Sequence, residues 1–400
     1  MKLTFFLSFI LTLLSTTTTT ISLPNPNLNP NQKSPSFLCD CYIPSASDPE
    51  TFFTHYKFWD FRNVALPSDL ETTQTNPHDP STTFHTYPLT KTIFDRDWRA
   101  QNWSREATPI GPVPIVNTDR NVFLLKDPSS GQLAPKSSFL VLRTTRFADH
   151  ASTAELEGTF GFVYHCSLRV RMRMLSREGI LRVADNTNPR KRPPPPASSS
   201  GIPKGTCAGI FTYRSAQCES DIEILTSEDP HTIHYANQPD YDPVTDKVIS
   251  GASSVVNLST PWTDWVTHRL DWHSGSSVWF ADGQVRANLS YSVPDQPSYV
   301  AMNLWSDGGV WSGEMRVGES VFMAIEWIEL VYNVSSGGGL QGPIRDRPGQ
   351  RVRHRRPSVD LPSMRGDTVD RPSAMEVSVS RAEVKRQTGK TRIAGCQQPC

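Results

Sequence analysis

Residues 219–225 of this 400-residue chain read Glu-Ser-Asp-Ile-Glu-Ile-Leu, with a carboxylate at every second position up to Glu223. Successive side chains of a β-strand point to opposite faces. A strand here therefore sets Glu219, Asp221 and Glu223 in a row on one face and turns the isoleucines toward a core. Three neighbouring carboxylates repel one another. Either a function offsets that cost, or the row is the solvated outer face of an edge strand.

Such a row suits hydrolysis of a glycosidic bond, in which one carboxylate attacks and another protonates the leaving oxygen. Retaining enzymes hold these two groups about 5–5.5 Å apart. Cα atoms four residues apart in a strand lie about 13 Å apart, so two long Glu side chains must lean inward over a curved sheet. We expect Glu219 to be the nucleophile and Glu223 the acid/base. Asp221 between them would raise the proton affinity of its neighbours.

Three further residues are candidates for substrate binding. Trp305 and Trp311 lie in a Gly-rich segment, residues 303–313, where exposed indoles would stack on sugar rings. Asn237 follows the acidic strand and is expected on a neighbouring strand, with a simple turn as the alternative. The pattern predicts core positions for the strand tryptophans and a structural role for His268. No metal site and no cofactor are expected.

Short β-prone runs separated by turn residues recur through the middle of the chain. They occupy residues 138–144, 160–174, 266–272, 278–281 and 326–332. The Asp282-Gly283 pair predicts a hairpin turn. Many short strands and few helical periods indicate an all-β sandwich.

The chain ends differ from this middle region. Lys2 and the apolar run after it predict a signal peptide over residues 1–22, followed by a flexible lead-in over 23–36. Residues 185–203 are predicted to form a Pro-rich surface loop. Residues 336–400 hold thirteen Lys/Arg against six Asp/Glu and lack aromatic residues, which predicts a disordered basic tail. That tail either binds an anionic polymer or membrane surface, or is merely solvated.

Several features indicate export. Four Asn-X-Ser sequons predict glycosylation at Asn102, Asn257, Asn288 and Asn333. Seven cysteines favour disulfides in an oxidising compartment; a Cys207–Cys218 bridge would brace the acidic strand, although the connectivity stays open. No segment after the leader is apolar enough to span a membrane, and the formal charge of zero suggests no nucleic-acid partner. We therefore expect a secreted, extracellular or cell-wall protein that is a monomer.

Residues 37–335 resemble glycoside hydrolase family 16, and secreted fungal members in particular. The Glu-X-Asp-X-Glu strand at 219–223 matches that family's hallmark in full. The segments 267–272, 278–283 and 303–313 resemble its strand-hairpin pair and cleft loop, and the opening at 39–42 resembles fungal members. Ser220 departs from the bulky aliphatic residue that is common there.

The resemblance implies a concanavalin A-like jelly-roll β-sandwich whose concave sheet carries a glycan cleft. It also implies retaining chemistry on β-linked glucans, with the first Glu as nucleophile and the second as acid/base. The leading hypothesis is a secreted endo-β-glucanase acting on β-1,3- or mixed β-1,3/1,4-glucan. The alternatives are a cell-wall glucan transglycosylase using the same carboxylates and a lectin-like module that binds glucan without cleaving it.

Overall fold

The computed structural model describes one compact set of segments. These are residues 41–44, 51–62, 64, 66, 69, 71–76, 79–127, 137–184, 201–335 and 395–396. Contacts divide the chain into Met1–Cys39 and Asp40–Cys400, and every described residue belongs to the second unit. The predicted signal peptide and lead-in, most of the Pro-rich loop and nearly all of the basic tail lie outside the described residues.

Seven antiparallel strands form the first sheet, in the spatial order β5, β10, β21, β12, β13, β14 and β17. Their bounds are Trp98–Ala100, Ala151–Gly158, Tyr299–Trp305, Cys207–Ser215, Cys218–Leu225, Thr232–Asn237 and Ser253–Asn257. The acidic strand β13 thus lies inside the sheet with a partner on each side, so it is not an edge strand.

The second sheet is centred on the long strand β22, which pairs with β11 along one side and with β2 and then β9 along the other. Beyond β11 follow β18, β19 and β20, and beyond β9 follow β8, β4 and β3. The bounds in chain order are His55–Asp60 (β2), Thr72–Asn76 (β3), Asp79–Pro88 (β4), Val122–Asp127 (β8), Ser137–Arg146 (β9), Cys166–Ser176 (β11), Val266–His273 (β18), Ser276–Ala281 (β19), Gln284–Leu289 (β20) and Ser320–Tyr332 (β22).

The remaining elements are short. They are Tyr42–Ile43 (β1), Leu89–Lys91 (η2), Ile93–Arg96 (η3), Ser104–Arg105 (β6), Ile115–Asn117 (β7), Asp119–Asn121 (η4), Arg177–Ala184 (α1), Tyr241–Asp242 (β15), Lys247–Val248 (β16) and Gly395–Cys396 (β23). Strand β23 pairs with β1. Among the described residues, no helix is long and apolar enough to cross a membrane.

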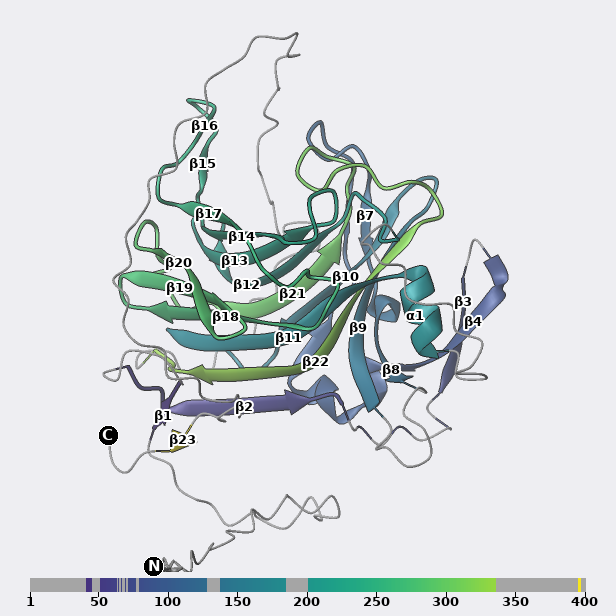
Figure 1. Ribbon diagram of the computed structural model, residues 1–400, viewed down its shortest axis with the longest axis horizontal. Coiled ribbons are helices and arrows are strands. Elements are labelled where there is room, and N and C mark those ends of the chain that lie inside the picture. The colour runs from purple at the N-terminus through teal and green to yellow at the C-terminus, as the bar shows by residue number, and fades with distance from the viewer. Residues whose placement is uncertain are drawn as a thin grey trace, which may run out of the picture. The chain divides into compact units, whose positions relative to one another are not determined.

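The two sheets stack as the layers of an all-β jelly-roll sandwich, which confirms the predicted fold class (Figure 1). One apolar cluster fills the space between them and takes side chains from both sheets. On β11, Leu168, Val170 and Met172 point into this cluster, whereas Arg169 between them bonds Glu329 at 3.0 Å on the outer face. Alternation of apolar and charged residues along β11 therefore fixes which face of the second sheet is buried.

Most of the predicted strand tryptophans and the predicted turn are where the sequence placed them. Trp272 and Trp279 are fully buried in the core, and Trp327 is buried outside that cluster against Phe58. Asp282 and Gly283 both have positive φ, at 49° and 78°, in the two-residue turn between β19 and β20. Such a turn matches the right-handed twist of the strands that it joins.

Candidate functional site

Strand β13 presents its three carboxylates on one face of the first sheet, as the alternation predicted. Glu219, Asp221 and Glu223 are 3%, 3% and 6% exposed. Ile222 and Ile224 lie in the apolar core on the opposite face. Because the acids are buried within a central strand, the interpretation of this row as a solvated edge face is wrong.

The register between strands shows which residues share this acidic face. Directly across the sheet, Glu223 is opposite Gly209 on β12 and His234 on β14. Gly209 is in turn opposite Asn303 on β21, and Asn303 is opposite Glu155 on β10. Residues that pair directly share a face, so one row of side chains runs from Glu155 to His234 and contains Glu223.

Asp221 has a defined partner directly after the neighbouring strand β14. Gln238 donates from Nε2 to Asp221 Oδ2 at 2.9 Å, and its backbone N–H donates to the Glu219 carbonyl. Asn237 lies on the other face: Ser220 Oγ donates to its Oδ1 at 2.6 Å, and its Nδ2 donates to the Tyr291 carbonyl. The structure therefore places Gln238, and not the predicted Asn237, beside the carboxylates.

Two hydrogen-bond donors contact the same carboxylate oxygen of Glu223. The indole N–H of Trp311 donates to Glu223 Oε1 at 3.3 Å, and the thiol of Cys207 lies 3.5 Å from it. The Trp311 ring also meets His234 edge-on, with centroids 5.0 Å apart, and His234 Nε2 is 2.7 Å from Glu228 Oε2. One predicted tryptophan is thus held against the predicted acid/base.

The Gly-rich segment that carries Trp311 is organised by Asp307. Its Oδ1 accepts from the backbone N–H of Gly309 and from Ser312 Oγ, each at 3.0 Å. Its Oδ2 forms a 2.7 Å ion pair with Arg105. Gly309 is packed so closely that an added Cβ would lie 2.1 Å from the Ile110 carbonyl oxygen. These contacts connect the loop to the strand that bears Arg105.

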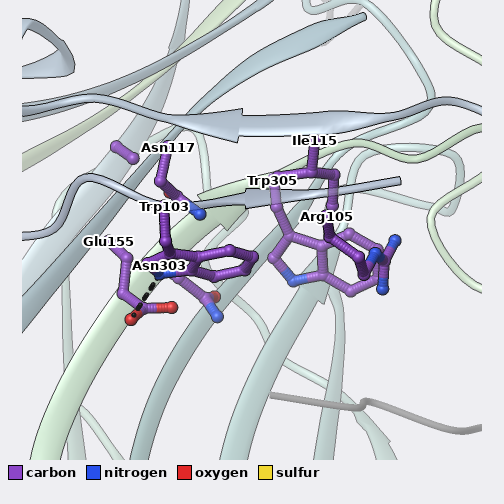
Figure 2. Close-up of a pocket in the computed structure, with 8 residues that line it drawn as sticks. Trp103, Arg105, Ile115, Asn117, Glu155, Asn303 and Trp305 are labelled. Atoms are coloured by element: carbon purple, nitrogen blue, oxygen red, sulfur yellow. Dashed lines mark hydrogen bonds between the residues drawn. The ribbon is translucent and has the colours of Figure 1, made fainter. Parts of the chain in front are cut away.

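A pocket opens on the same face beside Trp305, the last residue of β21. It is lined by Trp103, Arg105, Ile115, Asn117, Ala154, Glu155, Asn303 and Trp305. Figure 2 shows the indoles of Trp103 and Trp305 in this pocket, with the Trp103 N–H donating to Glu155 at 3.2 Å. Asn303 and Glu223 lie two strands apart, so their Cα atoms are about 10 Å apart. The pocket thus adjoins the carboxylate row.

Three polar atoms of this pocket are buried without a hydrogen-bond partner among the described residues: Asn117 Oδ1, Asn303 Oδ1 and Arg105 Nε. A buried polar atom without a partner is costly, and a polar ligand would remove that cost. The pocket therefore combines apolar ring surfaces with one donor and two acceptors. Glu155, Trp103 and Asn117 were not predicted, because only the pairing of distant strands brings them together.

The cysteine chemistry differs from one expectation. Cys207 and Cys218 are not in disulfides. The two cysteines lie at the two ends of the β12–β13 hairpin, because Cys207 pairs with Leu225 and Cys218 pairs with Ser215. The predicted bridge is therefore wrong, because about eight residues of strand, or about 25 Å, separate them. Cys41 is disulfide-bonded.

The four sequon asparagines occupy different environments. Asn102, Asn257 and Asn288 are exposed. Asn333 is half-buried: its Oδ1 accepts from the Thr54 backbone N–H at 2.9 Å and its Nδ2 donates to the Phe52 carbonyl. A glycan on Nδ2 of Asn333 would replace that last bond, so Asn333 is the least accessible acceptor of the four.

No protein-family model matches the chain. In sequence it is 25% identical over 148 residues to a beta-glucanase of Paenibacillus polymyxa, covering 34% of this chain and 56% of that protein. A beta-glucanase of Paenibacillus macerans is 28% identical over 148 residues, with the same coverage. The chain thus spans about half the length of the curated relatives that it matches.

Two solved structures illustrate the structural likeness. The Bacillus licheniformis beta-glucanase gives a TM-score of 0.41 at 17% identity, covering 62% of this chain and 98% of that one. A glycoside hydrolase family 16 endo-glucanase from Bacteroides ovatus gives 0.40 at 14% identity, covering 60% and 97%. The sequence likeness to beta-glucanases, together with the Glu219–Glu223 strand, supports the predicted resemblance to glycoside hydrolase family 16. The likeness to fungal members stays a prediction.

Proposed function

We propose that this protein is a retaining endo-β-glucanase that hydrolyses β-1,3- or mixed β-1,3/1,4-glucan. One observation carries the proposal: three buried carboxylates stand in a row beside a pocket that offers indoles and buried polar atoms without partners. The sequence relatives are named beta-glucanases, which supports the same substrate class.

In the proposed mechanism Glu219 attacks the anomeric carbon while Glu223 protonates the departing glycosidic oxygen. A glycosyl–Glu219 ester results. Glu223, now a carboxylate, takes a proton from water, which attacks the same carbon and restores Glu219. Asp221 stands between them and is held by Gln238 at 2.9 Å, so its negative charge stays fixed beside both reacting groups.

The pocket lined by Trp103 and Trp305 would bind glucose units of the chain. Indole faces pack against the C–H faces of sugar rings. Sugar hydroxyls can donate to Asn117 Oδ1 and Asn303 Oδ1 and accept from Arg105 Nε, three pocket atoms that are buried without a hydrogen-bond partner among the described residues. A neutral polyhydroxylated ligand would both pack against the indole rings and form hydrogen bonds with the polar atoms, whereas an apolar ligand would only pack against the rings.

We further propose that the protein is secreted, or held in the cell wall, and acts as a monomer. The N-terminal apolar run and the three exposed sequon asparagines, Asn102, Asn257 and Asn288, support export. Peptide mapping of secreted material, with and without enzymatic removal of N-glycans, tests this directly. Glycans at those three sites and little at Asn333 are expected.

The test of activity uses the purified chain and Glu219→Gln with β-1,3-glucan, mixed-linkage glucan and a labelled oligosaccharide acceptor. Mass spectrometry should show shorter unlabelled products from the wild type alone, and proton NMR should show the β-anomer first. The variant should keep its fold and bind glucan without turnover. Label in longer products would assign transglycosylation instead. Binding without turnover by the wild type would assign the lectin-like function.

A further inference from the structure

Asp307 lies between the pocket and the Gly-rich segment that carries Trp311. It follows β21 by two residues and is buried, at 7% exposure. Its Oδ2 accepts a hydrogen bond from Arg105 Nη2 at 2.7 Å. Arg105 lines the pocket, where its Nε is buried without a hydrogen-bond partner among the described residues (Figure 2). One oxygen of Asp307 therefore fixes the side chain that offers the pocket a buried donor.

The other carboxylate oxygen of Asp307 holds the Gly-rich segment itself. This Oδ1 accepts from the backbone N–H of Gly309 and from Ser312 Oγ, each at 3.0 Å. Gly309 and Ser312 lie on either side of Trp311 in the chain. The indole N–H of Trp311 in turn donates to Glu223 Oε1 at 3.3 Å. The backbone around Trp311 is thus attached to one oxygen atom, at the point where its indole contacts the expected acid/base.

Two glycines allow Asp307 to approach both partners. A Cβ on Gly111 would lie 2.4 Å from Asp307 Oδ2 and 3.0 Å from Arg105 Nη2, so a larger residue there would push the ion pair apart. A Cβ on Gly309 would lie 2.1 Å from the Ile110 carbonyl oxygen. The segments that contain these glycines therefore meet backbone to backbone, and the carboxylate of Asp307 lies where they meet.

We propose that Asp307 is a positioning residue, which holds Arg105 in the pocket and Trp311 beside the acid/base. The catalytic meaning of these contacts rests on the proposed function, whereas the placement of Trp311 by Asp307 does not. Because the two carboxylate oxygens serve different groups, substitution can separate the two tasks. Loss of the Arg105 contact should weaken substrate binding, and loss of the contacts to Oδ1 should slow turnover.

The experiment follows Trp311 by ¹⁹F NMR in the full chain labelled with 5-fluorotryptophan, the signal being assigned by its loss in Trp311→Phe. Asp307→Ala removes both sets of contacts, Ser312→Ala removes one contact to Oδ1, and Arg105→Met removes the ion pair alone. Glu314→Ala is the matched control, because it removes an exposed carboxylate from the same segment. If Asp307→Ala fails to fold, Ser312→Ala and Arg105→Met still test the two tasks separately.

The Trp311 signal should shift in Asp307→Ala and Ser312→Ala and stay at its wild-type position in Glu314→Ala. On glucan, kcat should fall about fivefold in Asp307→Ala and Ser312→Ala, as loss of one hydrogen bond implies. KM should rise about fivefold in Asp307→Ala and Arg105→Met for the same reason. A merely structural role would lower Tm and the yield of folded enzyme without this division between kcat and KM.

Two results would overturn the proposal. One is a Trp311 signal that does not move in the Oδ1 variants, or that moves as far in Glu314→Ala. The other is a wild-type KM in Arg105→Met. A wild type without activity on glucans would instead refute the proposed function, and the ¹⁹F spectra would still decide whether Asp307 places Trp311.

Discussion

His268 makes the folded protein sensitive to acid in a way that can be calculated. It lies on β18 between Val170 and Ala281 in register, fully buried, and neither ring nitrogen has a hydrogen-bond partner among the described residues. Burial lowers the pKa of the imidazole to about 4. The prediction of a structural histidine agrees with this position, but its ring is not satisfied by hydrogen bonds.

The sign follows from proton linkage. An exposed histidine in the unfolded chain titrates near pH 6.5, so between pH 6.5 and pH 4 the unfolded state binds a proton that the folded state excludes. This contribution to stability is complete above pH 6.5 and is lost as the pH falls. The loss is about 2 kcal/mol at pH 5 and levels off at about 3 kcal/mol below pH 4.

Urea unfolding followed by tryptophan fluorescence at pH 7 and pH 5 measures this loss. His268→Met replaces the ring by an apolar side chain that cannot titrate, and it should lose about 2 kcal/mol less stability than the wild type over that interval. The control is His85→Gln, at an exposed position, which should keep the wild-type pH dependence. Equal losses in the wild type and His268→Met would refute the reasoning.

Three further changes test the site and its support. Gly209→Ala puts a Cβ at 2.6 Å from Asn303 Oδ1; we expect it to raise KM for glucan several-fold with little change in Tm, and an unchanged KM would contradict the role of that row. Trp305→Ala removes a ring of the pocket and should weaken oligosaccharide binding by about 1 kcal/mol in calorimetry, whereas unaltered affinity would place the sugar elsewhere. Ile222→Ala opens a cavity behind the acidic strand and should cost about 2–5 kcal/mol in urea unfolding; a loss well below this would mean that the core there is loosely packed.

The sequence predicted the parts of the site that depend on local alternation. The period of two along residues 219–225 is enough to put the carboxylates on one face and Ile222 on the other, and it does so in the structure. The Gly-rich segment with Trp305 and Trp311 was likewise recognisable, although the expected exposure is wrong for Trp305, which ends β21 and is buried.

What the sequence did not predict depends on register between strands. Asn237 and Gln238 are neighbours in the chain, and only the pairing of Asn237 with Ser220 shows that Gln238 faces the acids. Glu155 joins the site through three strand pairings over a separation of 68 residues from Glu223. The Cys207–Cys218 error has the same origin, since closeness in sequence says little about distance across a hairpin.

The most direct test of the central claim is to trap the covalent intermediate. A 2-deoxy-2-fluoro β-glucan oligosaccharide with a good leaving group should glycosylate the nucleophile, with loss of that leaving group, and turn over slowly, because fluorine destabilises the transition state of both steps. Intact mass followed by peptide mapping should find one oligosaccharide on Glu219, and none in Glu219→Gln. An adduct on Glu223 or elsewhere, or no adduct on a protein that cleaves glucan with inversion, would contradict the account.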